Sequence, residues 1–332
     1  MPLVSLGDLA QSTMLRRNMG LIKTQMDVLS QEMATGVSAD VTRKTAADLG
    51  PLHALDNRLA QLEGFYAATT ELELMAAGQQ AALGVIDGFA TTLAPQLLSA
   101  AAGSQPGSLS AIGDDGEQKF KAAISALNTR AGDRSLFAGM ATDRSPLPDG
   151  ETILQALETA IGTLATAEDV RLAVSAWFDD PAGFGALYQG QGVLAPVAIS
   201  QGETAELTVT AQTDGIRETL KGFAMAALVD RNQPGPALEG RAQLAKLAGQ
   251  QLLNSQSARS EVAARLGVAE QQIAAAQSRN SAESTALEIA RSKIVAVDPM
   301  ETASRLDEAS TQLELIYAIT ARMSRMTLSD YL

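Results

Sequence analysis

The chain has 332 residues and a net charge of −13, with 46% hydrophobic residues, 4% aromatic residues and no cysteine. An acidic surface argues against nucleic acid and membranes as partners, and no apolar run approaches the roughly 20 residues of a membrane span. The lack of cysteine excludes disulfides, thiolate metal sites and cysteine nucleophiles, and the start "MPLVSLGDLA" lacks the pattern of a signal peptide.

The first predicted element is a helix over residues 15–35, "LRRNMGLIKTQMDVLSQEMAT". Its apolar residues alternate at spacings of four and three, which is the period of a helix that packs against another helix. This predicted seam consists of Leu15, Met19, Ile22, Met26, Leu29 and Met33. The three methionines suit an interface that must adapt to more than one neighbour.

Two long stretches, 52–94 and 237–298, contain no proline and carry helical apolar spacing. Because proline interrupts helices beyond their first turn, long helices are predicted there. Between them, "SAAAGSQPGSLSAIGDDGE" at 99–117 is rich in glycine and serine and predicts a loop or hinge.

The middle of the chain differs in composition, because residues 120–223 hold seven of the twelve aromatic residues. The segment "PVAISQGETAELTVTAQTDG" predicts two strands around Gln201-Gly202, since Val197, Ile199, Leu207 and Val209 alternate with polar residues. The region is therefore interpreted as a small mixed domain inserted between helices.

The last predicted helix starts at "VDPMETASRL", where Asp298 can cap, Pro299 suits the first helical position and Glu301 fits a capping box. Its seam has two series spaced by seven residues. They are Leu306, Leu313 and Thr320, and Ala309, Ile316 and Met323.

The predicted fold is mainly α: a long antiparallel helical rod with paired N- and C-terminal coiled-coil helices and a small inserted α+β domain. Residues 1–50 with 285–332 form the predicted terminal assembly domain, 51–135 with 233–284 the helical rod, and 136–232 the inserted outer domain. The first helix is expected to pack on the last.

The sequence predicts no catalytic, cofactor or metal site. His53 has no second histidine for a zinc pair, and "GQGVLA" at 190–195 precedes a proline and a strand where a nucleotide fingerprint needs a helix. The pairs Asp114-Asp115 and Asp179-Asp180 lie in stretches with turn-forming residues, with no partner base in view.

Three stretches in order resemble the flagellin superfamily, and within it the family of hook–filament junction proteins. They are "LSQEMATGVSADVTRKTAADLGPLHALDNRLAQLEGFYAATTELELM", "RSLFAGMATDRSPL" and "VDPMETASRLDEASTQLELIYAITARMSRMTLSDYL". The turn "ATGVSADVTRK" and the long helical stretch before the predicted strands depart from the family pattern.

The resemblance implies a structural, non-enzymatic, extracellular protein of the flagellum, exported by its type III apparatus after a transient cytoplasmic stage. The implied partners are further copies of the chain in a ring, a neighbouring hook-associated protein, filament flagellin and a cytoplasmic export chaperone at the C-terminal region. Filament flagellin is the nearest alternative. A cytosolic helical signalling scaffold, and an enzyme with its site around Trp177 to Tyr188, are the alternatives from other classes.

Overall fold

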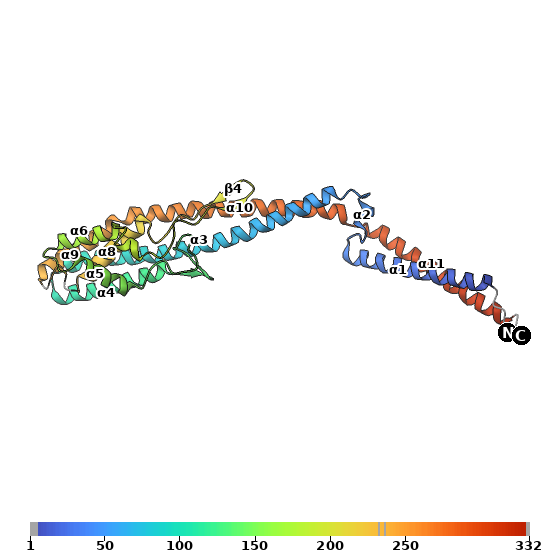
Figure 1. Cartoon of the computed structure of the whole chain (residues 1–332), viewed down its shortest axis with the longest axis horizontal. Coiled ribbons are helices and arrows are strands. Elements are labelled where there is room, and N and C mark those ends of the chain that lie inside the picture. The colour runs from blue at the N-terminus through green and yellow to red at the C-terminus, as the bar shows by residue number, and fades with distance from the viewer. Residues whose placement is uncertain (1–5, 232, 236, 330–332) are drawn as a thin grey trace. The chain divides into compact units, whose positions relative to one another are not determined.

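The computed structural model describes residues 6–231, 233–235 and 237–329, and this part of the chain is mainly helical (Figure 1). The elements up to residue 179 are α1 (Leu6–Thr35), α2 (Val41–Lys44), α3 (Gly50–Gly103), α4 (Pro106–Leu127), β1 (Arg130–Ala131), β2 (Arg134–Ser135), α5 (Gly150–Ile161) and α6 (Ala167–Asp179). The elements after residue 179 are α7 (Phe184–Leu187), β3 (Val197–Ser200), β4 (Glu203–Ala205), α8 (Asp214–Leu228), α9 (Leu238–Asn254), α10 (Gln256–Val295) and α11 (Pro299–Ser329). The expectation of a mainly α fold with long helices is confirmed.

The chain divides into two compact units: the residues up to Leu62 together with those from Ala282 onward, and residues 63–281. Helices α3 and α10 contribute to both units. Within the second unit they run antiparallel: Arg259 of α10 pairs with Asp87 of α3, while Gln277, later in α10, bonds to Glu73, earlier in α3.

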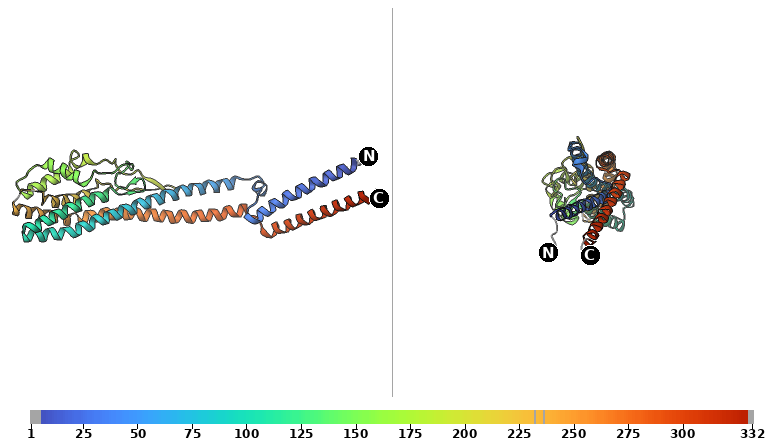
Figure 2. Two further views of the ribbon diagram at one scale, coloured as in Figure 1. Left: turned by 90° about the horizontal axis from the view of Figure 1, so that it is seen from below. Right: turned by 90° about the vertical axis from the view of Figure 1, so that its right-hand side faces the viewer.

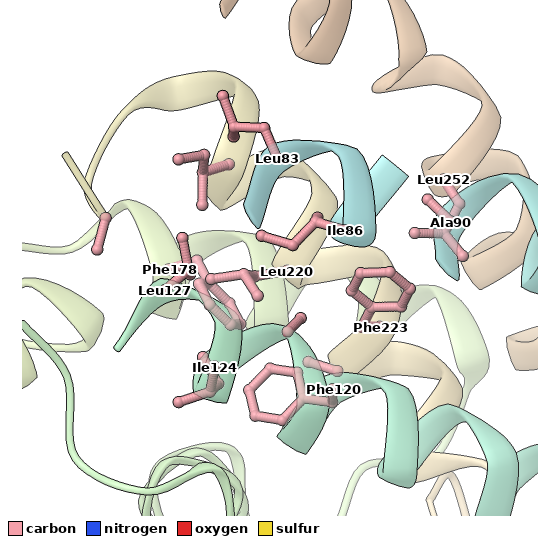
Figure 3. Close-up of a cluster of buried hydrophobic side chains, with 14 of the residues drawn as sticks. Leu83, Ile86, Ala90, Phe120, Ile124, Leu127, Phe178, Leu220, Phe223 and Leu252 are labelled. Atoms are coloured by element: carbon pink, nitrogen blue, oxygen red, sulfur yellow. The ribbon is translucent and has the colours of Figure 1, made fainter. Parts of the chain in front are cut away.

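Helix α8 lies in the centre of the second unit, and nearly all of its residues are buried. It packs against α4 on one side and α9 on another. Figure 3 shows Phe223 and Leu220 of α8 among side chains from α3, α4, α6 and α9. Because α8 falls within 136–232, the predicted inserted domain shares one core with the helices around it.

The structure therefore corrects the predicted boundaries at 136 and 232, which both fall inside the second unit. Buried aromatics on both sides of position 136 belong to the same cluster, as Phe120, Phe178 and Phe223 illustrate. Clustering of aromatics along the sequence reflected the density of this shared core, and did not mark a separate domain.

The predicted loop at 99–117 is also wrong, because only Ser104 and Gln105 separate α3 from α4. Helix α3 continues through Pro95, since Leu93, Ala94 and Leu97 around it are fully buried in the core. Buried apolar contacts of this extent outweigh the hydrogen bond that proline removes.

The glycines of α4 are required by packing. A Cβ added to Gly116 would lie 2.6 Å from the Cβ of Ala226 in α8, and one added to Gly113 would lie 2.8 Å from the backbone nitrogen of Asp230. Glycine at these positions lets two helices approach closely. In the sequence the same glycines resembled turn signals.

We expect Gly116→Ala to lower the free energy of unfolding by about 1–3 kcal/mol, because the added methyl group forces α4 and α8 apart. Gly107→Ala on the same helix is the matched control, since nothing lies within 4 Å of its added Cβ. Urea unfolding of both variants measures the difference. Equal stability of the two would show that α4 and α8 are not held in close contact.

Arg231 joins three carboxylates near the end of α8. Its guanidinium lies 2.8 Å from Glu117 of α4, and 2.7 Å and 3.3 Å from Glu151 and Glu158 of α5. Lys121 pairs with Glu117 and Glu151 as well. The hydrogen bonds from Arg231, then Lys121, lower the pKa of Glu151 to about 2, and Arg231 likewise lowers the pKa of Glu117.

We expect Arg231→Met to destabilise the protein by about 2–3 kcal/mol at pH 7. This is less than the cost of breaking a fully buried ion pair, because solvent reaches the carboxylates. The pKa of Glu151 is lowered on folding, so its stabilisation is present above pH 4.5 and is lost as the pH falls from 4.5 towards 2. Stability lost in that pH window should therefore be smaller in Arg231→Met than in the natural chain. Urea unfolding at several pH values measures this.

The control for Arg231 is Arg171→Met, which breaks the solvent-exposed pair with Glu168 and should change stability by about 0.5 kcal/mol or less. If the free energies of unfolding of the natural chain and Arg231→Met differ by the same amount from pH 7 to pH 2, the ion pairs of Arg231 do not contribute the pH-dependent stability.

Two irregular segments between α4 and α8, at 136–140 and 189–192, make close backbone contacts. Gly139 forms a parallel bridge with Gln191, and the Met140 N–H donates to the Gln191 carbonyl at 2.9 Å. A Cβ on Gly139 would lie 2.1 Å from the Gly192 carbonyl oxygen. The "GQG" segment therefore packs against the "LFAG" segment, which explains its glycines without a nucleotide.

The predicted strands around Gln201-Gly202 are present as β3 and β4, which pair antiparallel. Residues 207–209 do not extend the second strand. Buried amides hold this region to the long helices: Gln79 of α3 donates to the carbonyls of Leu136 and Val209, and Asn280 of α10 donates to that of Ile199.

The predicted helical stretch 237–298 is divided at Ser255 into α9 and α10. Arg259 stabilises this break, because its guanidinium donates to the Leu252 carbonyl and the Ser255 hydroxyl while pairing with Asp87.

Helix α3 has the length and composition of a membrane span, with a window of 18 residues at a mean hydropathy of 1.3, of which 39% is buried. This corrects the expectation that no apolar run of such length exists. Core helices of soluble proteins have the same composition, and Ile86, Leu93 and Leu97 of α3 lie in the core of the second unit.

Candidate assembly surface

Helices α1 and α11 pack against each other along their length (Figures 1 and 2). They run antiparallel, since Val37 after α1 pairs with Ala296 before α11, and Lys23 lies over the ring of Tyr317, 5.8 Å from its centroid. Helix α11 begins as predicted: Pro299 is its first residue, and the Met300 N–H donates to the Asp298 carboxylate at 2.9 Å. The expected pairing of the terminal helices is confirmed.

The seam predicted on α1 faces inward for most of its length. Leu29 is buried, and Leu15, Met19, Ile22 and Met26 are half-buried. Met33 is exposed at 47%. The buried position next to it is Glu32, whose carboxylate accepts the Ala39 N–H at 2.8 Å and the Ser38 hydroxyl at 3.3 Å.

The seam predicted on α11 behaves similarly at its first four positions. Ala309 is buried, and Leu306, Leu313 and Ile316 are half-buried. Thr320 is exposed and donates its hydroxyl to the Ile316 carbonyl of its own helix. The side chain of Met323 lies outside the described part of the chain.

Each terminal helix also exposes apolar residues outside its seam, and this second face was not singled out in the sequence. On α1, Met14, Leu21 and Val28 recur every seven residues and are 67%, 61% and 38% exposed. On α11, Leu315 and Ile319 are one turn apart and are 62% and 41% exposed. The seven-residue spacing of the α1 series was the available signal. One pair of helices thus leaves much of its apolar surface in water.

Charge is unevenly divided between the two units. The unit that contains α1 and α11 has 11 basic and 14 acidic residues, a net charge of −3. The unit of residues 63–281 has 14 basic and 24 acidic residues, a net charge of −10, so the two sum to the −13 of the whole chain. The unit with the terminal helices is therefore the one in which like charges oppose close association least.

Several of the aromatic and acidic side chains considered above for a catalytic site are engaged in core packing or ion pairs. Trp177 and Phe178 pack edge to face at 5.1 Å between ring centroids, within the core. Asp179 pairs with the buried Lys221 at 2.7 Å, and Asp115 lies on helix α4, paired with Lys119. Among the described residues, no group of three or more histidine, aspartate or glutamate side chains is placed to hold a metal ion.

Comparison with known proteins bears on the C-terminal part of the chain. Residues 251–332 match the family model of the bacterial flagellin C-terminal helical region. The matched segment comprises the end of α9 and the whole of α10 and α11, including the α11 seam. The match supports membership of the flagellin superfamily and a structural role in the flagellum.

One solved structure similar to this chain is described as that of a "putative flagellar hook-associated protein from Vibrio parahaemolyticus". It shares 13% sequence identity with this chain at a TM-score of 0.48, and the alignment covers 75% of this chain and 97% of that one. At this similarity the match carries no argument about function. No curated protein matches the chain.

Proposed function

We propose that this chain joins the hook of the bacterial flagellum to its filament, as a junction protein of the hook-associated protein 3 type. One observation carries the proposal beyond the family match: α1 and α11 pair through a narrow seam and leave a second apolar face in water. A helix pair of this kind is completed by further helices of neighbouring subunits.

The free energy of burial favours packing of the α1–α11 pair against helices of neighbouring subunits. Leu15, Met19, Ile22 and Met26 are only half-buried in the isolated pair, while full burial of one such side chain is worth about 1.5–3 kcal/mol. Ordering each residue costs roughly 1–2 kcal/mol of backbone entropy. Additional burial on assembly therefore supplies a large part of the stability of the terminal helices.

In this proposal the seam residues of α1 and α11 form an inner layer shared among copies of the chain in a ring. The ring contacts a neighbouring hook-associated protein on one side and filament flagellin on the other. Before assembly, the chain binds a cytoplasmic export chaperone through its C-terminal region and leaves the cell through the flagellar type III apparatus.

Deletion of the gene, followed by electron microscopy of the cells, tests the proposal. The expected result is hooks without filaments, with flagellin shed into the medium and filaments restored by the natural gene on a plasmid. Normal filaments in the deletion strain would contradict a junction role.

Filament flagellin is the second candidate, favoured by the match of residues 251–332 to the flagellin C-terminal region. The two roles differ in copy number, because a junction ring needs few subunits and a filament needs very many. Quantitative mass spectrometry of sheared flagella separates them: abundance far below that of the major filament protein supports the junction, and equal abundance supports the filament.

A further inference from the structure

Two helix breaks lie side by side in the first unit, one after α1 and the other between α10 and α11. On the N-terminal side, α1 ends at Thr35, and Gly36 adopts a left-handed φ of 70° that favours glycine. On the C-terminal side, only residues 296–298 separate α10 from α11, and Pro299 lacks the N–H that would bond to the Val295 carbonyl in a continuous helix.

A small backbone bridge joins these two breaks. The Ser38 N–H donates to the carbonyl of Val295, the last residue of α10, at 2.9 Å. The Val297 N–H, just before α11, donates to the Gly36 carbonyl at 3.0 Å. The end of α1 is therefore bonded on both sides of the break between α10 and α11.

Side chains reinforce the bridge. The buried carboxylate of Glu32 accepts the Ala39 N–H, which holds the turn after α1 against the last turn of that helix. Lys44 of α2 donates to the carbonyl of Ala296. Ala46 and Ala47, between α2 and α3, have φ values of 50° and 67°, a left-handed conformation that alanine adopts only under constraint.

We propose that residues 36–40 and 296–298 form a coupled joint, in which the backbone bridge sets the direction of the α1–α11 pair and makes both helices turn as one body. The C-terminal connection of three residues acts as the pivot, and the longer connection from 36 to 49 follows it. Without the bridge, each helix would bend at its own break. The inference rests on the geometry of this joint and does not depend on the proposed function.

Proline substitutions remove the bridge; Ser38→Pro also removes the hydroxyl that donates to Glu32, a loss that the Ser38→Ala control shares. Ser38→Pro deletes the donor to Val295, and Val297→Pro deletes the donor to Gly36. Both positions lie outside the helices, in the connections 36–40 and 296–298, so neither substitution places a proline in a helix interior. Ser38→Ala and Val297→Ala keep the N–H groups and are the matched controls.

Spin-label distances measured in the full chain test the joint, and the lack of native cysteine makes the labelling specific. Labels at Gln25→Cys and Ala286→Cys report α1 against α10, and labels at Gln25→Cys and Thr311→Cys report α1 against α11. We expect the first distribution to widen at least twofold in the Ser38→Pro/Val297→Pro variant and to stay narrow in the alanine controls. The second distribution should stay narrow in every variant.

Three results of the distance measurements would overturn the proposal. If the α1–α10 distance distribution is the same in the proline variant as in the natural chain, the bridge does not set the direction of the α1–α11 pair. The same conclusion follows if the natural chain already shows a distribution as broad as that of the proline variant. If both the α1–α10 and the α1–α11 distance distributions widen, the bridge holds α1 and α11 together and does not set their direction. Hydrogen exchange at Ser38 and Val297 provides a measurement without proline: both amides should be protected in the natural chain, and fast exchange of both would contradict the bridge.

Discussion

Excision of residues 136–232, with the ends rejoined by a short flexible linker, should abolish cooperative unfolding of the second unit. The excised segment contains α8, which packs against α4 and α9 and is buried along nearly its whole length. Its removal would expose Phe120 and Ile124 of α4 and Leu252 of α9, which lie around α8 in Figure 3. Thermal melting followed by near-ultraviolet circular dichroism measures the loss of fixed side-chain packing.

A pair of single substitutions gives a graded version of the same test. Leu220→Ala removes a fully buried side chain of α8 and should cost about 2–5 kcal/mol in the free energy of unfolding. Leu172→Ala is the control on α6, where the side chain is 51% exposed, and should cost about 0.5 kcal/mol or less. A cooperative melt in the excised chain, together with a small effect of Leu220→Ala, would show that 136–232 is an independent domain.

The sequence predicted the parts of the fold that depend on local periodicity. The four-and-three spacing through Leu15, Ile22 and Leu29 placed the inward face of α1, and Asp298-Pro299 placed the start of α11. These features succeed because a helix period and a cap are properties of neighbouring residues, whatever the rest of the chain does.

Prediction from the sequence was wrong where tertiary contacts determine the conformation or burial of a residue. Gly113 and Gly116 look like turn residues, yet they lie in helix α4. They are glycine because Asp230 and Ala226 leave no room for a side chain. Two residues of the predicted seam, Met33 and Thr320, are exposed in the isolated helix pair, and their part in assembly stays a prediction. Glu32, which is buried at the end of α1, was passed over because an isolated glutamate in a helix normally faces solvent.

Ile316→Lys should block assembly while leaving the second unit as stable as in the natural chain. Ile316 lies on the seam of α11, half-buried, and a lysine there places a charge where neighbouring helices must bury apolar surface. The second unit has its own core, to which Ile316 does not belong. Its unfolding can be followed through Trp177, the single tryptophan of the chain, which packs at that core.

Two further variants separate pairing within the chain from contact between chains. Leu315→Lys changes a residue that is 62% exposed in the isolated pair, so it should leave the pair intact but still block assembly if that face is buried between subunits. Thr311→Lys adds the same charge at an exposed position on the opposite side of the helix from the seam, and is the control.

The measurement is complementation of the deletion strain with each variant, scored as filaments per cell, beside urea unfolding of each purified protein by tryptophan fluorescence. We expect at least a tenfold loss of filaments for Ile316→Lys and Leu315→Lys, near-natural numbers for Thr311→Lys, and unfolding midpoints within experimental error of one another. Because burial of a single large aliphatic side chain is worth about 1.5–3 kcal/mol, its loss weakens every contact between neighbouring subunits in the proposed ring by about this amount. Filaments restored by Ile316→Lys would place the assembly contacts elsewhere on the chain, and a lowered midpoint for that variant would show that the terminal helices stabilise the core before assembly.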